Sequence, residues 1–131
     1  MKTSDLTGSA LDWAVARSLG IPAEEIRVNW MGVFRNLRDE DGNLRDGYMT
    51  GPDLLFSRKW EAGGPIIDLE RISIRTYAAP GRNWVAFIDC GGSSISGAKA
   101  RQVGPTALVA AMRCFVASKL GDTVELPKEL Q

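Results

Sequence analysis

The sequence contains no histidine, and this absence removes several classes of active site at once. A serine or cysteine nucleophile that relies on a histidine base is excluded, and so is every zinc site with a histidine ligand. Only Cys90 and Cys114 are present, and their separation lacks the C-x-x-C spacing of zinc or redox sites. We therefore expect both to be reduced thiols in the core, since free cysteine is commonly buried.

The sequence also lacks an excess of charge and long apolar runs. Its 16 Lys and Arg residues balance 16 Asp and Glu residues, so no overall field attracts nucleic acid, although a local basic face stays open. No apolar run reaches the roughly 18 to 20 residues of a membrane span, and residues 1–5 do not resemble a secretory signal. We expect no membrane association and a cytoplasmic location.

What is present fits one folded unit. The chain has 131 residues, of which 44% are hydrophobic, and no internal repeat or low-complexity tract is visible. This length is enough to bury most of the apolar surface around one core. The sequence therefore predicts a single domain over residues 1–131.

Helices are predicted near both ends of the chain. Thr7 caps the first and Gly20 ends it, while Thr106 caps the last and Gly121 ends it. The apolar residues at helical spacing are Leu11, Ala14 and Val15 in the first helix, and Leu108, Met112, Phe115, Val116 and Leu120 in the last. The tail after Gly121 is short, and we expect it to fray.

Strands are predicted between these helices. Residues 26–34 alternate as one strand, and the charged stretch Arg35 to Gly47 is typical of a hairpin with its tip at Asp41-Gly42. Residues 48–56 form a weak return strand, and Gly63-Gly64-Pro65 a turn that opens a short helix.

A meander of three strands follows the short helix. It spans residues 71–77, 84–88 and 95–103, with its second strand central and its third at an edge. The sequence thus predicts an α+β fold: a mainly antiparallel sheet of about four to five strands, packed by an N-terminal helix, a short middle helix and a long C-terminal helix.

Two stretches approach known ligand motifs without completing them. Residues 92–99 come near the phosphate-binding loop, but Ala98 separates the glycine from the lysine and Ala100 replaces the metal-binding hydroxyl. Residues 39–43 resemble the start of a calcium loop, yet Thr50 stands where a bidentate glutamate belongs. We interpret them as an inter-strand loop and a solvated hairpin tip, and predict no cofactor and no metal.

Three carboxylates are candidates for acid–base chemistry if the fold brings them together: Asp68, Glu70 and Asp89. The favoured interpretation is structural, with Asp68 and Glu70 on the solvated side of a helix and Asp89 hydrogen bonded where a strand turns. No residue is therefore predicted to be catalytic, and the chain is not predicted to be an enzyme.

A recognition patch is the remaining candidate site. Trp60 beside Arg58 and Lys59 combines a large ring with cations, as in protein hot spots and nucleobase platforms. The alternative is a buried Trp60 that braces the glycine turn. Lys99 and Arg101, just before the last helix, are further candidates for contact with a partner.

Three segments carry a family resemblance: LTGSALDWAVA at 6–16, WEAGGPII at 60–67 and GPTALVAAMRCFVASKLG at 104–121. Their order and spacing resemble the small phage proteins called NinX, and the last two also resemble the related phage α-β-α sandwich domain. The resemblance is weakest over residues 29–56. It implies an accessory protein of a phage or prophage, expressed in a bacterial cytoplasm, and it carries no catalytic residues.

Three functions follow from these observations. The first is a non-catalytic module that binds a phage or host protein. The second is nucleic-acid binding, because a helix, an antiparallel meander and a helix is also the order of elements in double-stranded RNA-binding domains. The third is a small-ligand binder or enzyme, which requires a pocket that joins Asp68 or Asp89 to another titratable group.

Overall fold

The computed structural model describes residues 1–29, 32–43, 54–76, 83–88 and 99–131. Within them, three α-helices accompany a two-stranded and a three-stranded antiparallel sheet. The helices are α1 (Gly8–Ser18), α2 (Trp60–Glu70) and α3 (Ala107–Leu120), and the strands are β1 (Ile26–Asn29), β2 (Gly32–Arg35), β3 (Ile72–Thr76), β4 (Trp84–Ile88) and β5 (Lys99–Gly104). The α+β fold with N-terminal, middle and C-terminal helices is as predicted.

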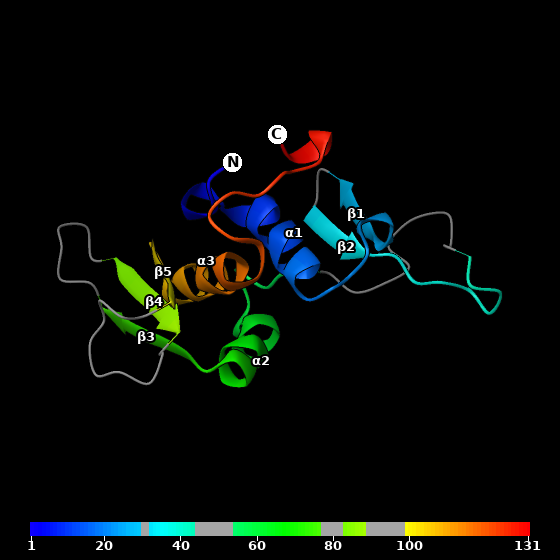
Figure 1. Ribbon diagram of the computed structural model, residues 1–131. Helices are drawn as coiled ribbons and strands as arrows, with labels where there is room; N and C mark the ends of the chain where they lie inside the picture. Colours follow the sequence, from blue (N-terminus) through cyan, green and yellow to red (C-terminus); the bar gives the residue numbers. More distant parts are fainter. Residues whose placement is uncertain (30–31, 44–53, 77–82, 89–98) are drawn as a thin grey trace.

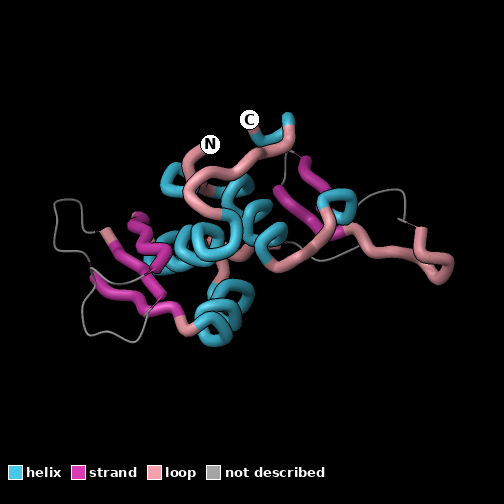
Figure 2. Tube along the Cα trace, in the orientation of Figure 1, coloured by secondary structure: helices cyan, strands magenta, loops and turns pink. Residues whose placement is uncertain are grey.

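Helix α3 lies at the centre of this arrangement (Figure 1). The sheet β3-β4-β5 packs against it, α1 and α2 also contact it, and the β1-β2 hairpin packs on α1 (Figure 2). Its residues from Ala110 to Val116 are all buried, so this helix is enclosed on several sides. Leu120, expected in the buried stripe, is instead 40% exposed because α3 leaves the core at its last turn.

Both terminal helices begin and end where the sequence predicts. Thr106 Oγ1 accepts a hydrogen bond from the backbone N–H of Val109 at 3.1 Å, which satisfies a donor of the first turn of α3. Gly20, with φ of 89°, follows α1, and the N–H of Ile21 bonds the carbonyl of Ala16 at 3.1 Å. Glycine suits this left-handed position because it has no Cβ.

The three-stranded sheet has β4 at its centre, as its apolar sequence predicts. Its register shifts between Ala86, opposite Gln102, and Ile88, opposite Lys99. The extra residue lies in β5, where Ala100 takes a φ of 57°, as in a β-bulge. Strand β5 is an edge strand, and the predicted Pro80-Gly81 turn lies outside the described residues.

The single strand predicted over residues 26–34 is wrong, because this stretch folds back on itself as a hairpin. Val28 lies opposite Val33 and Asn29 opposite Gly32. Asn29 Oδ1 accepts the N–H of Gly32 at 3.2 Å, and Gly32 has a φ of 145° that favours glycine. The alternation continues through the turn, so the pattern of apolar residues could not reveal it.

The predicted glycine turn before a short helix is also wrong, because α2 begins at Trp60 and runs through Gly63 and Pro65. A Cβ on Gly63 would lie 2.5 Å from the carbonyl oxygen of Phe56 and 2.6 Å from Leu108 Cδ1. Glycine is therefore needed here for close packing against α3, and its role is not to break the helix.

The tail after α3 is packed and hydrogen bonded, so the prediction that it frays is wrong. Val124 and Met1 exchange two backbone bonds, of 2.9 and 3.0 Å, and Thr3 bonds the carbonyls of Asp122 and Gly121. Val124 is also buried. Figure 1 shows the two chain ends at the same edge of the molecule.

Candidate functional site

Residues 57–60 form a tight turn that opens α2, called here the Arg58 turn. The N–H groups of Arg58 and Lys59 both bond the carbonyl of Leu55, at 3.1 and 3.0 Å, and Lys59 then occupies the N-cap position of α2. This path places three consecutive residues, Arg58, Lys59 and Trp60, at the beginning of a rigid helix.

A buried carboxylate holds this turn in place. Asp12, in the middle of α1, has an exposed fraction of 0%. Its Oδ1 accepts the N–H of Ser57 at 2.8 Å and the Ser57 hydroxyl at 2.7 Å, while Oδ2 accepts Arg58 Nη2 at 3.1 Å. Three donors thus compensate one buried negative charge, as a buried charge requires.

The outer side of the Arg58 turn is exposed. Trp60 is 57% exposed, so the predicted alternative of a buried tryptophan bracing a glycine turn is wrong. The side chains of Arg58 and Lys59 are 46% and 56% exposed, and Lys59 makes a loose ion pair of 3.8 Å with Glu61. Three consecutive residues with exposed side chains, an aromatic ring and two cations, therefore lie at the start of α2.

The other two candidates lie elsewhere. Lys99 and Arg101 belong to β5, which packs against α3, whereas Arg58 contacts α1. Arg101 is exposed and lines a pocket with Asn83. The five predicted residues therefore form two separate groups, one on the Arg58 turn and one on β5.

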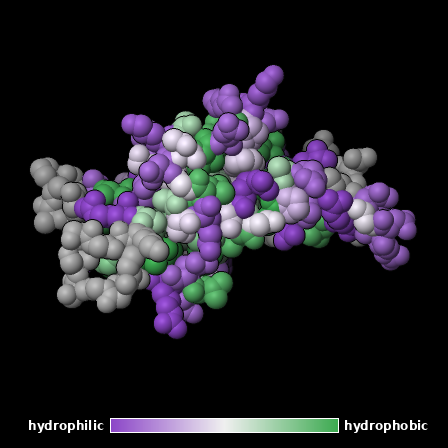
Figure 3. All heavy atoms as spheres, in the orientation of Figure 1, coloured by the Kyte–Doolittle hydropathy of each residue, from purple (hydrophilic) through white to green (hydrophobic). Residues whose placement is uncertain are grey.

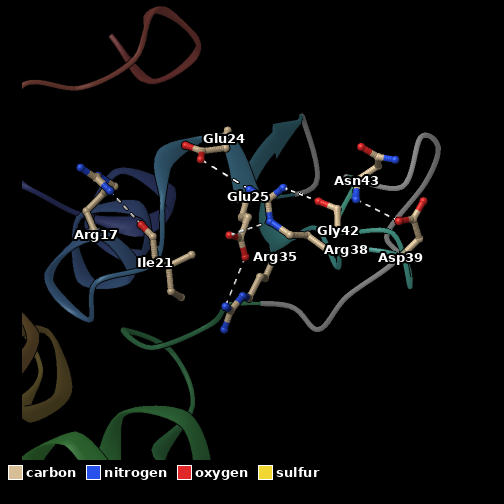
Figure 4. Close-up of polar contacts among 9 residues, drawn as sticks. All are labelled: Arg17, Ile21, Glu24, Glu25, Arg35, Arg38, Asp39, Gly42 and Asn43. Atoms are coloured by element: carbon tan, nitrogen blue, oxygen red, sulfur yellow. Dashed lines mark hydrogen bonds and ion pairs between the residues drawn. The ribbon is translucent and has the colours of Figure 1, made fainter.

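Hydrophilic residues gather on the projection that follows β2 (Figure 3). Glu25 accepts bonds from Arg35 Nη2 and Arg38 Nε, each at 3.3 Å, as Figure 4 shows. Arg38 also bonds the carbonyl of Gly42 at 2.8 Å and pairs with Glu24 at 3.5 Å. Among the described residues of this segment, Arg35 and Arg38 therefore each have a carboxylate partner.

The predicted turn at Asp41-Gly42 is present, although residues 44–47 of the predicted hairpin lie outside the described part of the chain. Asp39 Oδ1 accepts the N–H groups of Asp41 and Asn43, at 3.0 and 2.9 Å. Figure 4 shows the bond from Asn43. This is a local Asx-type turn in which the carboxylate serves the backbone. Over the described ranges, no group of three acidic, histidine or cysteine side chains is placed to hold a metal ion.

The candidate carboxylates and thiols show no joint arrangement in the described residues. Asp68 is exposed on α2, Glu70 pairs with Lys119 at 3.7 Å, and Asp89 lies outside the described ranges. Cys114 is a free, fully buried thiol, and burial raises its pKa to about 12, so it is uncharged near neutral pH. The placement of Cys90 is not described.

Sequence reasoning missed Asp12, the residue that organises the site. A signal was available, because Asp12 lies between Leu11 and Trp13 in a helix whose neighbouring positions are apolar. A carboxylate in that setting needs hydrogen-bond donors from another element. Its partners, Ser57 and Arg58, are 45 and 46 residues away, a separation that no local pattern reveals.

Comparison with known families relates the chain to a class of phage proteins. A family model described as bacteriophage P22 NinX matches residues 2–119. The chain belongs to this family, which supports its description as a phage accessory protein. No curated protein matches the sequence. Within the described residues, no helix is long and apolar enough to cross a membrane.

Proposed function

We propose that this phage accessory protein is a non-catalytic binding module in the bacterial cytoplasm, and that its Arg58 turn docks an acidic segment of a phage or host protein. The observation that carries the proposal is the 57% exposure of Trp60, directly after Arg58 and Lys59, at the start of a helix. Tryptophan and arginine are the residues most enriched among interface hot spots.

The anchoring of Arg58 strengthens this proposal. Its Nη2 bonds the buried Asp12, so the guanidinium is held at the surface in one orientation and loses little freedom when a partner binds. Lys59 adds a second exposed cation, held only by a loose ion pair of 3.8 Å with Glu61, so its ammonium can exchange that carboxylate for one from a partner segment.

A two-stage experiment tests the proposal. A photo-crosslinking side chain in place of Glu61, which is 79% exposed beside Trp60, first captures partners from infected cells, and calorimetry then measures the purified partner against variants. We expect Trp60→Ala to weaken binding at least about tenfold. The matched control is Leu69→Ala, which removes a 78% exposed side chain from the other end of α2 and should leave affinity within about twofold.

Two results would contradict this function. Equal losses in the two variants would show that Trp60 has no special role. A captured protein without an acidic segment, whose affinity does not fall as salt rises, would remove the electrostatic part of the proposal.

Nucleic-acid binding is the second candidate, favoured by the order of elements. Helix α2, the meander β3-β4-β5 and helix α3 follow one another as in double-stranded RNA-binding domains. The first turn of α3 carries Ala107, Leu108 and Val109, without the lysines that contact phosphates in those domains. A mobility shift with duplex RNA at two salt concentrations decides, because phosphate contacts weaken steeply with salt.

A further inference from the structure

Arg113 is a cation inside the core of the molecule. It lies in the middle of α3 between Met112 and Cys114, both fully buried, and is itself only 8% exposed. Its Nε donates to the carbonyl of Leu6 at 2.9 Å and its Nη1 to the carbonyl of Val103 at 2.7 Å. These bonds tie the start of α1 and the end of β5 to α3.

Both hydrogen-bond acceptors are neutral, so the charge of Arg113 has no direct counterion among the described residues. Burial lowers the pKa of Arg113, and the negative charge of Asp5 acts in the opposite direction. A cation in a medium of low dielectric is stabilised best by an anion in contact with it. Two carbonyls compensate this guanidinium only in part.

A pocket of about 440 Å³ opens beside this guanidinium. Arg113 lines it together with Asp5, Asn83, Arg101 and Gln102. The volume is within the range of sites for small molecules, roughly 300 to 1,000 Å³. The pocket therefore combines a cation that is more than nine-tenths buried with amide side chains that can donate and accept hydrogen bonds.

The charges on the walls define the class of ligand. Among the described wall residues, the buried guanidinium of Arg113 is positive and Asp5 is negative. Arg113 therefore suits an anion, and Asp5 disfavours a second negative charge on that anion, as on phosphate. The planar guanidinium also matches the geometry of a carboxylate.

We infer that the pocket between Asp5, Asn83 and Arg113 binds a small molecule that carries one carboxylate, with the guanidinium of Arg113 as the partner of that group. The site is separate from the Arg58 turn. It lies between η1 (Thr3–Asp5), β5 and α3, whereas the Arg58 turn opens α2 and is bonded to Asp12 of α1. It stands or falls independently of the proposed docking function.

The test uses two probes of nearly the same size, in which a carboxylate is exchanged for an uncharged amide. N-acetylglycine carries a carboxylate, and N-acetylglycinamide is its uncharged counterpart. Each is titrated into the full chain, and the backbone N–H signals of Arg101, Gln102 and Val103 and the Nε–H signal of Arg113 are followed by NMR. We expect saturating shifts with N-acetylglycine in the millimolar range, weaker shifts with inorganic phosphate, and no saturating shift with the amide.

Matched variants keep the test valid if Arg113 itself cannot be replaced without unfolding. Asp5→Asn removes the opposing charge and should tighten N-acetylglycine binding by roughly two- to fivefold, while Asp68→Asn removes an exposed charge on α2 and should leave it unchanged. Equal shifts with both probes, no shift up to about 50 mM, or an equal response of the two variants would overturn the inference.

Discussion

Arg58 and Arg113 both connect distant parts of the chain, but the buried charge is negative near Arg58 and positive at Arg113. At the Arg58 turn, the carboxylate of Asp12 is inside and the guanidinium is 46% exposed. At the pocket, the guanidinium of Arg113 is inside and the carboxylate of Asp5 is exposed. The buried member of the two charges is thus the anion in the first region and the cation in the second.

The difference lies in how completely each buried charge is compensated. Asp12 receives three hydrogen bonds, one of them from a cation. Arg113 donates two bonds to neutral carbonyls. A fully compensated buried charge orients the group outside it, whereas an incompletely compensated one attracts a ligand of opposite sign. This contrast is why we assign a docking role to the first region and ligand binding to the second.

Asp12→Ala should produce the largest loss of stability. It leaves the Ser57 hydroxyl and N–H without their acceptor in a buried place, so we expect the free energy of unfolding to fall by about 3 kcal/mol. Urea unfolding measures the change. Asp39→Ala is the control, because Asp39 also accepts two backbone bonds but on an exposed turn. Equal losses in the two variants would remove the distinction that burial makes.

Arg113→Met should cost less, about 1 to 2 kcal/mol, although this side chain is also buried. Two carbonyls lose a donor, but the desolvated charge disappears at the same time. Arg75→Met, at an exposed position of β3, should be nearly neutral in the same unfolding assay. A loss as large as that of Asp12→Ala would show that Arg113 is fully compensated and that the contrast is wrong.

Arg58→Met should destabilise the fold by about 0.5 to 1 kcal/mol, because the ion pair is partly solvated and Ser57 keeps its bonds to Asp12. The variant should nevertheless reduce partner binding, which separates orientation of the surface from stability. Calorimetric unfolding measures the first effect. Should Arg58→Met unfold the chain as readily as Asp12→Ala, the guanidinium would be part of the core support and not an oriented surface group.

Asp5→Asn should have the smallest effect on stability, a loss below about 0.5 kcal/mol without ligand, since an exposed carboxylate acts on Arg113 through solvent. The loss should shrink further at high salt. Unfolding at low and high ionic strength checks this expectation. A loss that salt does not change would indicate that Asp5 acts through local structure and not through its charge.

The sequence predicted those elements whose causes are local. Helices α1 and α3 combine helical spacing with Thr7, Gly20, Thr106 and Gly121 at their ends. Strand β4 was recognised as central because its residues are apolar on both faces. In each case, the residues that determine the element lie inside it or next to it, so one segment contained the evidence.

The elements that were missed depend on distant contacts. Gly63 lies inside a helix at a point where the Phe56 carbonyl and Leu108 leave no room for a Cβ. Nothing in Gly63-Gly64-Pro65 shows this close contact. The tail is ordered by bonds to Met1 and Thr3, more than a hundred residues away. Asp12 likewise depends on Ser57. Of the candidate site, the residues Arg58, Lys59 and Trp60 could be predicted, whereas the support beneath them could not.

The pairing of the first and last segments also determines how the molecule would respond to force. Met1 bonds Val124 and Thr3 bonds Asp122 in antiparallel fashion, and Asp122 and Val124 follow residues 2–119, which the family model matches. Tension applied between the two ends would act on these bonds one after another, beginning with the bonds of Met1. The ends would therefore separate at low force, while α3 and its sheet would still be intact.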